Sequence, residues 1–230
     1  MAHDGTMNVF YEIVLGAHIV AGTVALLVFW IPLVTIKGGR THRRAGWVYV
    51  YAAATVAVTG LVTCGRLLSE GRPARWRAGA FLAYVALFAG ESAYLGVRAL
   101  RARGRPDAWQ RAGDVVGPTL LIGGGVALAA LGAHRANVLY VFFAALGVTQ
   151  GAEHFRFWLT AAAHGRERFF AHMTAMGTSC ITTLTAFVVV NAQRFGIRTF
   201  DPGLWIAPIA VLGIGLAIWR RSYEKRVSTG

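Results

Sequence analysis

Residues 10 to 36 read FYEIVLGAHIVAGTVALLVFWIPLVTI, and the chain leaves this apolar stretch through KGGR at 37 to 40. A helix that crosses the hydrocarbon core of a bilayer needs about 20 predominantly apolar residues. The only acidic or basic side chains in the stretch are Glu12 and His18. Its apolar run is continuous, whereas a strand of a membrane β-barrel would alternate with a period of two residues. The stretch therefore predicts a transmembrane helix.

The composition extends this prediction to the whole chain. Of the 230 residues, 56% are hydrophobic and 14% are charged, whereas soluble domains are about 45–50% apolar and about 25% charged. Lipid admits only helices and closed barrels, because the backbone must satisfy its own hydrogen bonds there. We expect an all-α integral membrane protein, a single transmembrane domain over residues 1–230 with about seven helices. The predicted spans are 10–36, 45–68, 78–98, 115–133, 137–159, 171–193 and 203–219.

The distribution of Lys and Arg predicts the orientation. Cytoplasmic loops carry an excess of these residues. If the N-terminus lies outside, 16 of the 23 basic residues fall on the inner side. They are Lys37, Arg40, Arg43, Arg44, Arg98, Arg101, Arg103, Arg105, Arg111, Arg156, Arg166, Arg168, Arg220, Arg221, Lys225 and Arg226. We therefore expect a multi-pass protein of the cytoplasmic (inner) membrane with a cytoplasmic C-terminus.

The net charge of +13 needs no nucleic acid as a partner, because a basic inner face beside anionic lipid accounts for it. The bilayer is the expected partner. A homo-oligomer or other partners in a membrane complex remain open alternatives.

Ionisable side chains inside the membrane are costly and often functional. His18, Glu91 and His154 fall inside predicted spans, and His42 and His172 fall at the starts of two others. The predicted chain directions bring His42, Glu91, His154 and His172 toward one layer near the cytoplasmic side. His18 lies in the outer half of its span, where it could form a second ligand layer or part of a proton path.

These residue types are the ones that build metal and haem sites in helical bundles. Histidines and carboxylates from facing helices ligate metals, so His42, Glu91, His154 and His172 are predicted metal ligands. Haem b takes two histidines from different helices; His42 with His172 is the predicted pair, and His18 is a further cofactor-binding candidate. A structural explanation competes with these functions, since His42 also fits an interfacial cation at a helix start.

The histidine and glycine pattern resembles a known family. The first span carries His18-Ile19-Val20-Ala21-Gly22, the second opens with His42-Arg43-Arg44-Ala45-Gly46, and His172 stands four residues before Met176. This is similar to bacterial multi-pass membrane proteins known only as a domain of unknown function. The resemblance is clearest over residues 15 to 65 and fainter over 165 to 195. It implies a membrane fold and no particular activity. Relatives often have Trp-Met after the later histidine, where this chain has Met173-Thr174.

Several functions fit these residues, and whether the protein is an enzyme stays open. The first hypothesis is a redox protein that binds haem b or a transition metal near the cytoplasmic side. The alternatives are a zinc-dependent membrane hydrolase, a proton-coupled carrier in which Glu91 and His18 titrate, and a structural subunit of a membrane complex. A retinal protein is excluded, because such proteins need a lysine in the last span and the chain's lysines are Lys37 and Lys225. Covalent c-type haem is also excluded, since no Cys-x-x-Cys-His is present.

Overall fold

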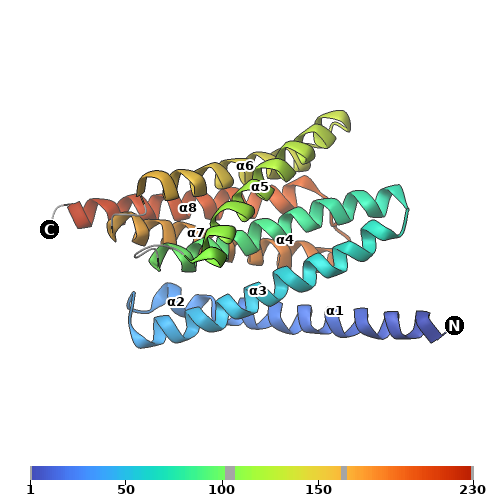
Figure 1. Ribbon diagram of the computed structural model, residues 1–230, viewed down its shortest axis with the longest axis horizontal. Helices are drawn as coiled ribbons and strands as arrows, with labels where there is room; N and C mark the ends of the chain where they lie inside the picture. Colours follow the sequence, from blue (N-terminus) through green and yellow to red (C-terminus); the bar gives the residue numbers. More distant parts are fainter. Residues whose placement is uncertain (1, 102–106, 162–164, 229–230) are drawn as a thin grey trace. The chain divides into compact units, whose positions relative to one another are not determined.

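The computed structural model describes residues 2–101, 107–161 and 165–228, and within these residues the chain is helical with no strand (Figure 1). Arg103 and Arg105, which entered the charge count, lie outside the described residues. The long helices and their bounds are α1 (Ala2–Val28), α3 (Arg40–Ser69), α4 (Pro73–Leu100), α5 (Ala108–His134), α6 (Val138–Arg156), α7 (Gly165–Ala192) and α8 (Pro202–Ser228). Three short elements are α2 (Trp30–Val34), the π-helix η1 (Phe157–Ala161) and the 3₁₀-helix η2 (Gln193–Phe195).

The predicted all-α membrane fold is confirmed. In the part of the chain that the structure describes, 6 helical stretches are long and apolar enough to cross a membrane. They are Met7–Val34, Arg40–Ser69, Pro73–Leu100, Ala108–His134, Gly165–Ala192 and Pro202–Lys225. The predicted span 137–159 corresponds to α6 and its continuation in η1, which are not among these six stretches, so this span stays a prediction. The protein is therefore a multi-pass integral membrane protein, and the side on which each end lies stays a prediction.

The chain forms two compact units, Met1–Gly90 and Glu91–Gly230, and the boundary falls within α4. In the first unit α1 lies along α3 (Figure 1). The helix breaks after Val28, four residues before Pro32, which has no N–H to donate to the Val28 carbonyl. Lys37 Nζ donates to the carbonyl oxygens of Pro32 at 2.8 Å and Leu33 at 2.6 Å. These bonds satisfy carbonyls that the end of α2 leaves without helical partners.

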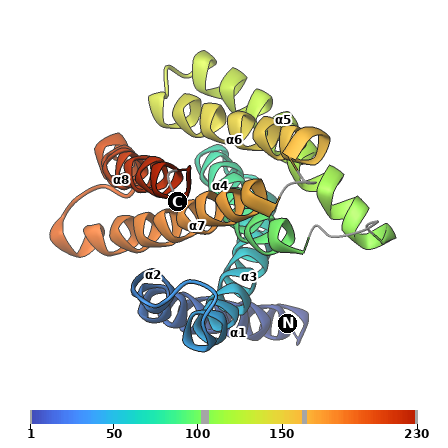
Figure 2. The same cartoon turned by 90° about the vertical axis from the view of Figure 1, so that its left-hand side faces the viewer.

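In the second unit α5 and α6 form an antiparallel hairpin, and α7 packs beside α8 (Figure 2). The start of α5 is fixed by a capping box: Asp107 Oδ1 accepts from the Gln110 N–H at 2.7 Å, and the Gln110 side chain accepts from the Asp107 N–H. The start of α6 is fixed by Asn137, whose Oδ1 accepts from the N–H groups of Leu139 and Tyr140. These caps set where α5 and α6 begin, and with them the positions of Asp114 and His154.

Candidate functional site

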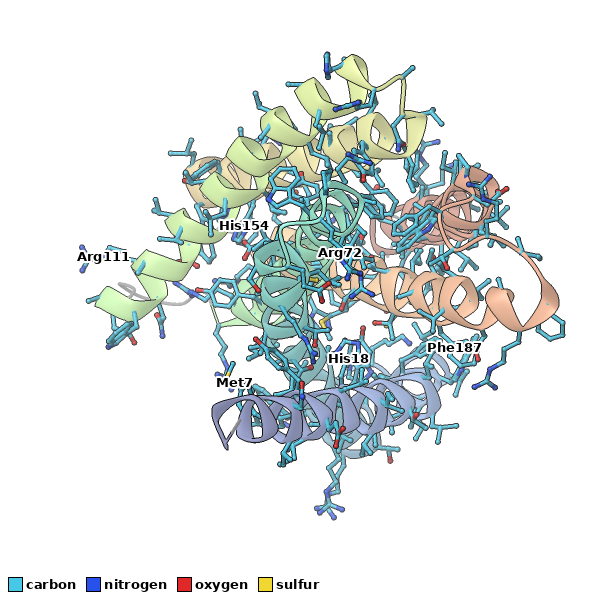
Figure 3. All side chains as sticks on the ribbon, turned by 90° about the vertical axis from the view of Figure 1, so that its right-hand side faces the viewer. Met7, His18, Arg72, Arg111, His154 and Phe187 are labelled. Carbon is cyan, nitrogen blue, oxygen red and sulfur yellow. The ribbon has the colours of Figure 1, made fainter. Side chains whose placement is uncertain are left out.

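The centre of the site is a buried pair formed by Glu91 on α4 and His154 on α6. His154 Nδ1 lies 2.5 Å from Glu91 Oε1, and the side chains are 0% and 7% exposed. The two atoms are close but not aligned as a hydrogen bond, and neither has another partner among the described residues. Figure 3 shows His154 within the helices of its unit, whereas Arg111 projects outward from α5. Glu91 and His154, which the sequence predicts to lie in the same layer of the membrane, are thus in direct contact.

Two glycines on α5 make room for this pair and its neighbour. A Cβ on Gly117 would collide with the Glu91 carboxylate, and a Cβ on Gly113 would collide with the Tyr94 hydroxyl. The two glycines stand one helical turn apart and therefore lie on the same face of α5. Their missing side chains allow the polar groups of α4 to approach the α5 backbone closely.

A second buried pair lies further along the same face of α4. Arg98 Nη2 donates to Asp114 Oδ2 at 2.8 Å, and the side chains are 7% and 9% exposed. The Tyr94 hydroxyl lies 3.1 Å from Asp114 Oδ1 and 3.2 Å from the Gln110 carbonyl oxygen, and it can donate to either. Both carboxylate oxygens of Asp114 therefore contact α4. A buried charge is tolerated only when it is paired, and here each of the two charges compensates the other.

Aromatic contacts join the two pairs into one cluster. The Arg98 guanidinium lies over the Trp158 ring, 4.5 Å from its centroid, which is a cation–π geometry. Ring centroids of His154 and Trp158 are 5.9 Å apart, and those of His154 and Tyr94 are 6.4 Å apart. Trp158 lies in η1, a π-helix, and such segments occur often at functional sites. We call this set the polar cluster: Glu91, Tyr94, Arg98, Asp114, His154 and Trp158.

Four members of this cluster, Tyr94, Arg98, Asp114 and Trp158, are not among the site residues predicted from the sequence. Arg98 was counted with the basic residues near the inner loops, but it is buried two residues before the end of α4. Tyr94, Asp114 and Trp158 were given no role. The available signal was the spacing of Glu91, Tyr94 and Arg98, at i, i+3 and i+7, which places three polar side chains on one face of an apolar helix.

His172, on α7, contacts a different face of α4 from the one that carries Glu91. Its Nδ1 is 2.7 Å from the Gly96 carbonyl oxygen. Gly96 stands five residues after Glu91, which is a rotation of about 140° around an α-helix of 3.6 residues per turn. His172 is thus close to the end of α4 that carries the polar cluster, but it meets the helix from another direction.

His18, on α1, and His42, at the start of α3, lie in the first unit and contact different residues. His18 Nδ1 is 2.9 Å from Thr59 Oγ1, and His42 Nδ1 is 3.1 Å from the Pro32 carbonyl oxygen. Thr59 stands 17 positions after His42 on the same helix, about 25 Å at 1.5 Å per residue. His18 and His42 therefore cannot ligate the same ion or the same haem iron.

His18, His42 and His172 share one local geometry. In each, Nδ1 faces an oxygen that can accept: carbonyl oxygens for His42 and His172, and for His18 a hydroxyl whose own proton is donated to the Thr55 carbonyl at 2.6 Å. A neutral imidazole with its proton on Nδ1 keeps its lone pair on Nε2. Histidines that ligate metals are usually held by this kind of Nδ1 bond, so the geometry fits a ligand role.

The structure places the four predicted metal ligands as one pair and two separate residues. Glu91 and His154 are in contact, His172 bonds to another face of α4, and His42 belongs to the Met1–Gly90 unit. Among the described residues, no group of three or more His, Cys, Asp or Glu side chains is placed to hold a metal ion. The joint metal site stays a prediction.

No protein-family model matches the chain, and comparison with curated proteins and with solved structures found no match. The resemblance to a domain of unknown function therefore stays a prediction from residues 15 to 65 and 165 to 195.

Proposed function

We propose that this membrane protein is a proton-coupled carrier in which Glu91 and His154 bind and release one proton inside the membrane. The observation that carries the proposal is their 2.5 Å contact, with both side chains buried and with Glu91 on α4, a helix long enough to span the bilayer. Strongly interacting ionisable groups give up their protons as a pair and not as two independent residues.

The charges around the pair support this function. With Glu91 ionised and His154 neutral, the pair carries one negative charge; one added proton makes it neutral on either residue. Arg98 and Asp114 already compensate each other. An uncompensated charge at the centre of a membrane helix costs about 2.5–3.5 kcal/mol on insertion scales. Loss of the proton therefore creates a charge that must be offset by water or by a bound solute, which is how proton binding becomes coupled to transport.

Infrared difference spectroscopy tests the proton binding. We expect purified protein, taken from mildly acidic to mildly alkaline pH, to lose either the carbonyl band of protonated Glu91 or the ring bands of protonated His154, according to which residue holds the proton. Glu91→Gln should abolish that change. Glu153→Gln is the matched control, because Glu153 is the residue before His154 but is exposed and paired with Arg156 at 2.5 Å. A wild-type spectrum without the band change, or one that Glu91→Gln leaves unaltered, contradicts the proposal.

Proton movement tests the transport. Vesicles containing the protein and an internal pH dye are given a membrane potential, and the rate of internal pH change is recorded. We expect wild-type protein and Glu153→Gln to exceed protein-free vesicles, and Glu91→Gln and His154→Gln not to do so. Equal rates for wild type and Glu91→Gln would remove Glu91 from the transport step.

A second candidate function is redox chemistry with haem b or a transition metal. The specific observation is the Nδ1 bond that holds His18, His42 and His172. From the sequence, His42, His172 and His18 are the predicted haem ligands, and His42, Glu91, His154 and His172 are the predicted metal ligands. Either group would supply electron transfer when bound. The absorption spectrum and elemental analysis of purified protein decide this. A Soret band selects haem, and bound iron without a Soret band selects a redox metal ion. The absence of both rejects the candidate.

The remaining alternatives have less support. A catalytic zinc takes three protein ligands, and no observed group of described residues favours the zinc-dependent hydrolase. Placement in the cytoplasmic membrane, with the C-terminus inside, rests on the excess of basic residues. Cysteine labelling tests it: residues 37–44 and the C-terminal tail should react from the same side. Protein partners or a homo-oligomer remain predictions.

A further inference from the structure

We propose that Asp114 passes the proton of the Glu91–His154 pair to the aqueous phase at the end of α4, through Tyr94 and water held within the polar cluster. This inference rests on the proposed function and adds a route and further proton-transfer residues to it.

The polar cluster leads from the interior of the helix to its end. Along α4, Glu91, Tyr94 and Arg98 cover about 10 Å at 1.5 Å per residue, and α4 ends at Leu100, about 14 Å beyond Glu91. Half of a hydrocarbon core of about 30 Å is nearly the same length. Asp114 lies six residues after the start of α5 at Ala108, and Arg111, between them, projects outward (Figure 3). The cluster thus joins mid-membrane to a helix end.

Polar atoms without protein partners lie along this route. Among the described residues, all buried side-chain nitrogen and oxygen atoms without a hydrogen-bond partner belong to Glu91, Arg98, His154 and Trp158. Besides the contacting Glu91 Oε1 and His154 Nδ1, they are Arg98 Nε, His154 Nε2 and Trp158 Nε1. Native proteins leave few such atoms unpaired. Buried water, which takes two to four polar partners, is their usual partner, and it would connect His154 to Tyr94.

The transfer balances without any further reactant. A proton leaves the Glu91–His154 pair for the water, the water gives a proton to the Tyr94 oxygen, and the Tyr94 hydroxyl proton moves to Asp114 Oδ1 over 3.1 Å. Water and Tyr94 end unchanged, the pair has lost one proton, and Asp114 has gained it. Arg98 keeps its charge throughout, and Asp114 then passes the proton to the aqueous phase.

The other ionisable groups on these helices do not enter the route. On α5, Arg111 is exposed and projects outward. On α6, Glu153 is exposed and paired with Arg156. On α7, His172 bonds to the Gly96 carbonyl on another face of α4.

The vesicle assay tests the route with two variants. Tyr94→Phe removes only the hydroxyl, and the double variant Arg98→Gln with Asp114→Asn removes both charges, so that no buried charge is left unpaired. We expect both to lower the proton rate, the double variant by about 100-fold, as loss of a positioned proton-transfer group does. The pH-dependent bands of the Glu91–His154 pair should still change in both, because the proton-binding pair is intact. Glu153→Gln should match wild type.

The outcomes separate the two proposals. If Glu91→Gln slows proton movement while Tyr94→Phe runs at the wild-type rate, the route is wrong and the proposed function stands. The route is equally wrong if the folded double variant runs at the wild-type rate. If Tyr94→Phe also abolishes the band change of the pair, its role is structural and the route is again overturned. If Glu91→Gln itself runs at the wild-type rate, the proposed function fails. Should the double variant not fold, Tyr94→Phe decides alone.

Discussion

His18 in the first unit and His154 in the second are both histidines inside membrane helices, and each places Nδ1 near one oxygen of a neighbouring helix. For His18 the oxygen is the Thr59 hydroxyl at 2.9 Å, and for His154 it is the Glu91 carboxylate at 2.5 Å. Protonation of His18 leaves a net positive charge beside a neutral group. Protonation of His154 beside ionised Glu91 removes a net charge. In the proposed carrier, the identity of one oxygen therefore separates the histidine that shares a proton from the one that does not.

The largest expected effect comes from breaking the buried charge compensation between Arg98 and Asp114. Asp114→Ala leaves the Arg98 guanidinium buried without its partner, which should lower the free energy of unfolding by about 3–5 kcal/mol. Thermal unfolding in detergent measures it. Glu153→Ala breaks an exposed ion pair and should cost about 0–1 kcal/mol. Similar losses in the two variants would show that the buried pair does not stabilise the polar cluster.

A smaller effect should follow when the carboxylate is pushed away from His154. In Gly117→Ala the new methyl group collides with the Glu91 carboxylate, and such overpacking costs about 1–3 kcal/mol. His154 would then lack an adjacent carboxylate, as His18 does, so the pH-dependent band change of the pair should weaken as well. Gly123→Ala on the same helix is the control, because its Cβ would meet nothing within 4 Å. A normal band in Gly117→Ala would mean that the contact is not needed for proton binding.

The smallest effect is expected at His18. Thr59→Val keeps the shape of the side chain and removes the hydroxyl that His18 contacts, at a cost of about 1 kcal/mol for one hydrogen bond. Thr23→Val is the control, because the Thr23 hydroxyl bonds to a carbonyl of its own helix. The proton rate in vesicles should be unchanged in both variants. A large loss of rate in Thr59→Val would make His18 part of the proton path and remove the contrast with His154.

The membrane helices could be predicted from the sequence because their signal is local. Continuous apolar runs bounded by groups such as Lys37-Gly38-Gly39-Arg40 indicate a span without reference to any other part of the chain. Glu91 and His154 could be singled out for the same reason, since a titratable side chain within such a run is costly wherever it points.

The partners of these residues could not be predicted in the same way. Arg98 and Asp114 each stand near a predicted helix end, where a charge normally faces water. Their burial depends on how closely α4 approaches α5, and that approach depends on the absence of side chains at Gly113 and Gly117. Likewise, His172 bonds to the carbonyl of Gly96, and a backbone acceptor leaves no mark in a sequence. A helix is specified by one stretch of sequence. A contact between two helices depends on two stretches that are far apart in the sequence, so neither stretch predicts it alone.

Asp114 has a mechanical consequence as well as an electrostatic one. One of its oxygens faces Tyr94 and the other faces Arg98, two residues one helical turn apart. The Asp114 carboxylate on α5 therefore contacts two successive turns of α4 and holds the two helices in one register. If α4 slid along α5 by one turn, about 5.4 Å, both contacts would break together and the Arg98 guanidinium would lose its carboxylate partner. Any conformational change that opens the proposed carrier first to one side and then to the other must therefore move the last turns of α4 and the first turns of α5 together, as one rigid body.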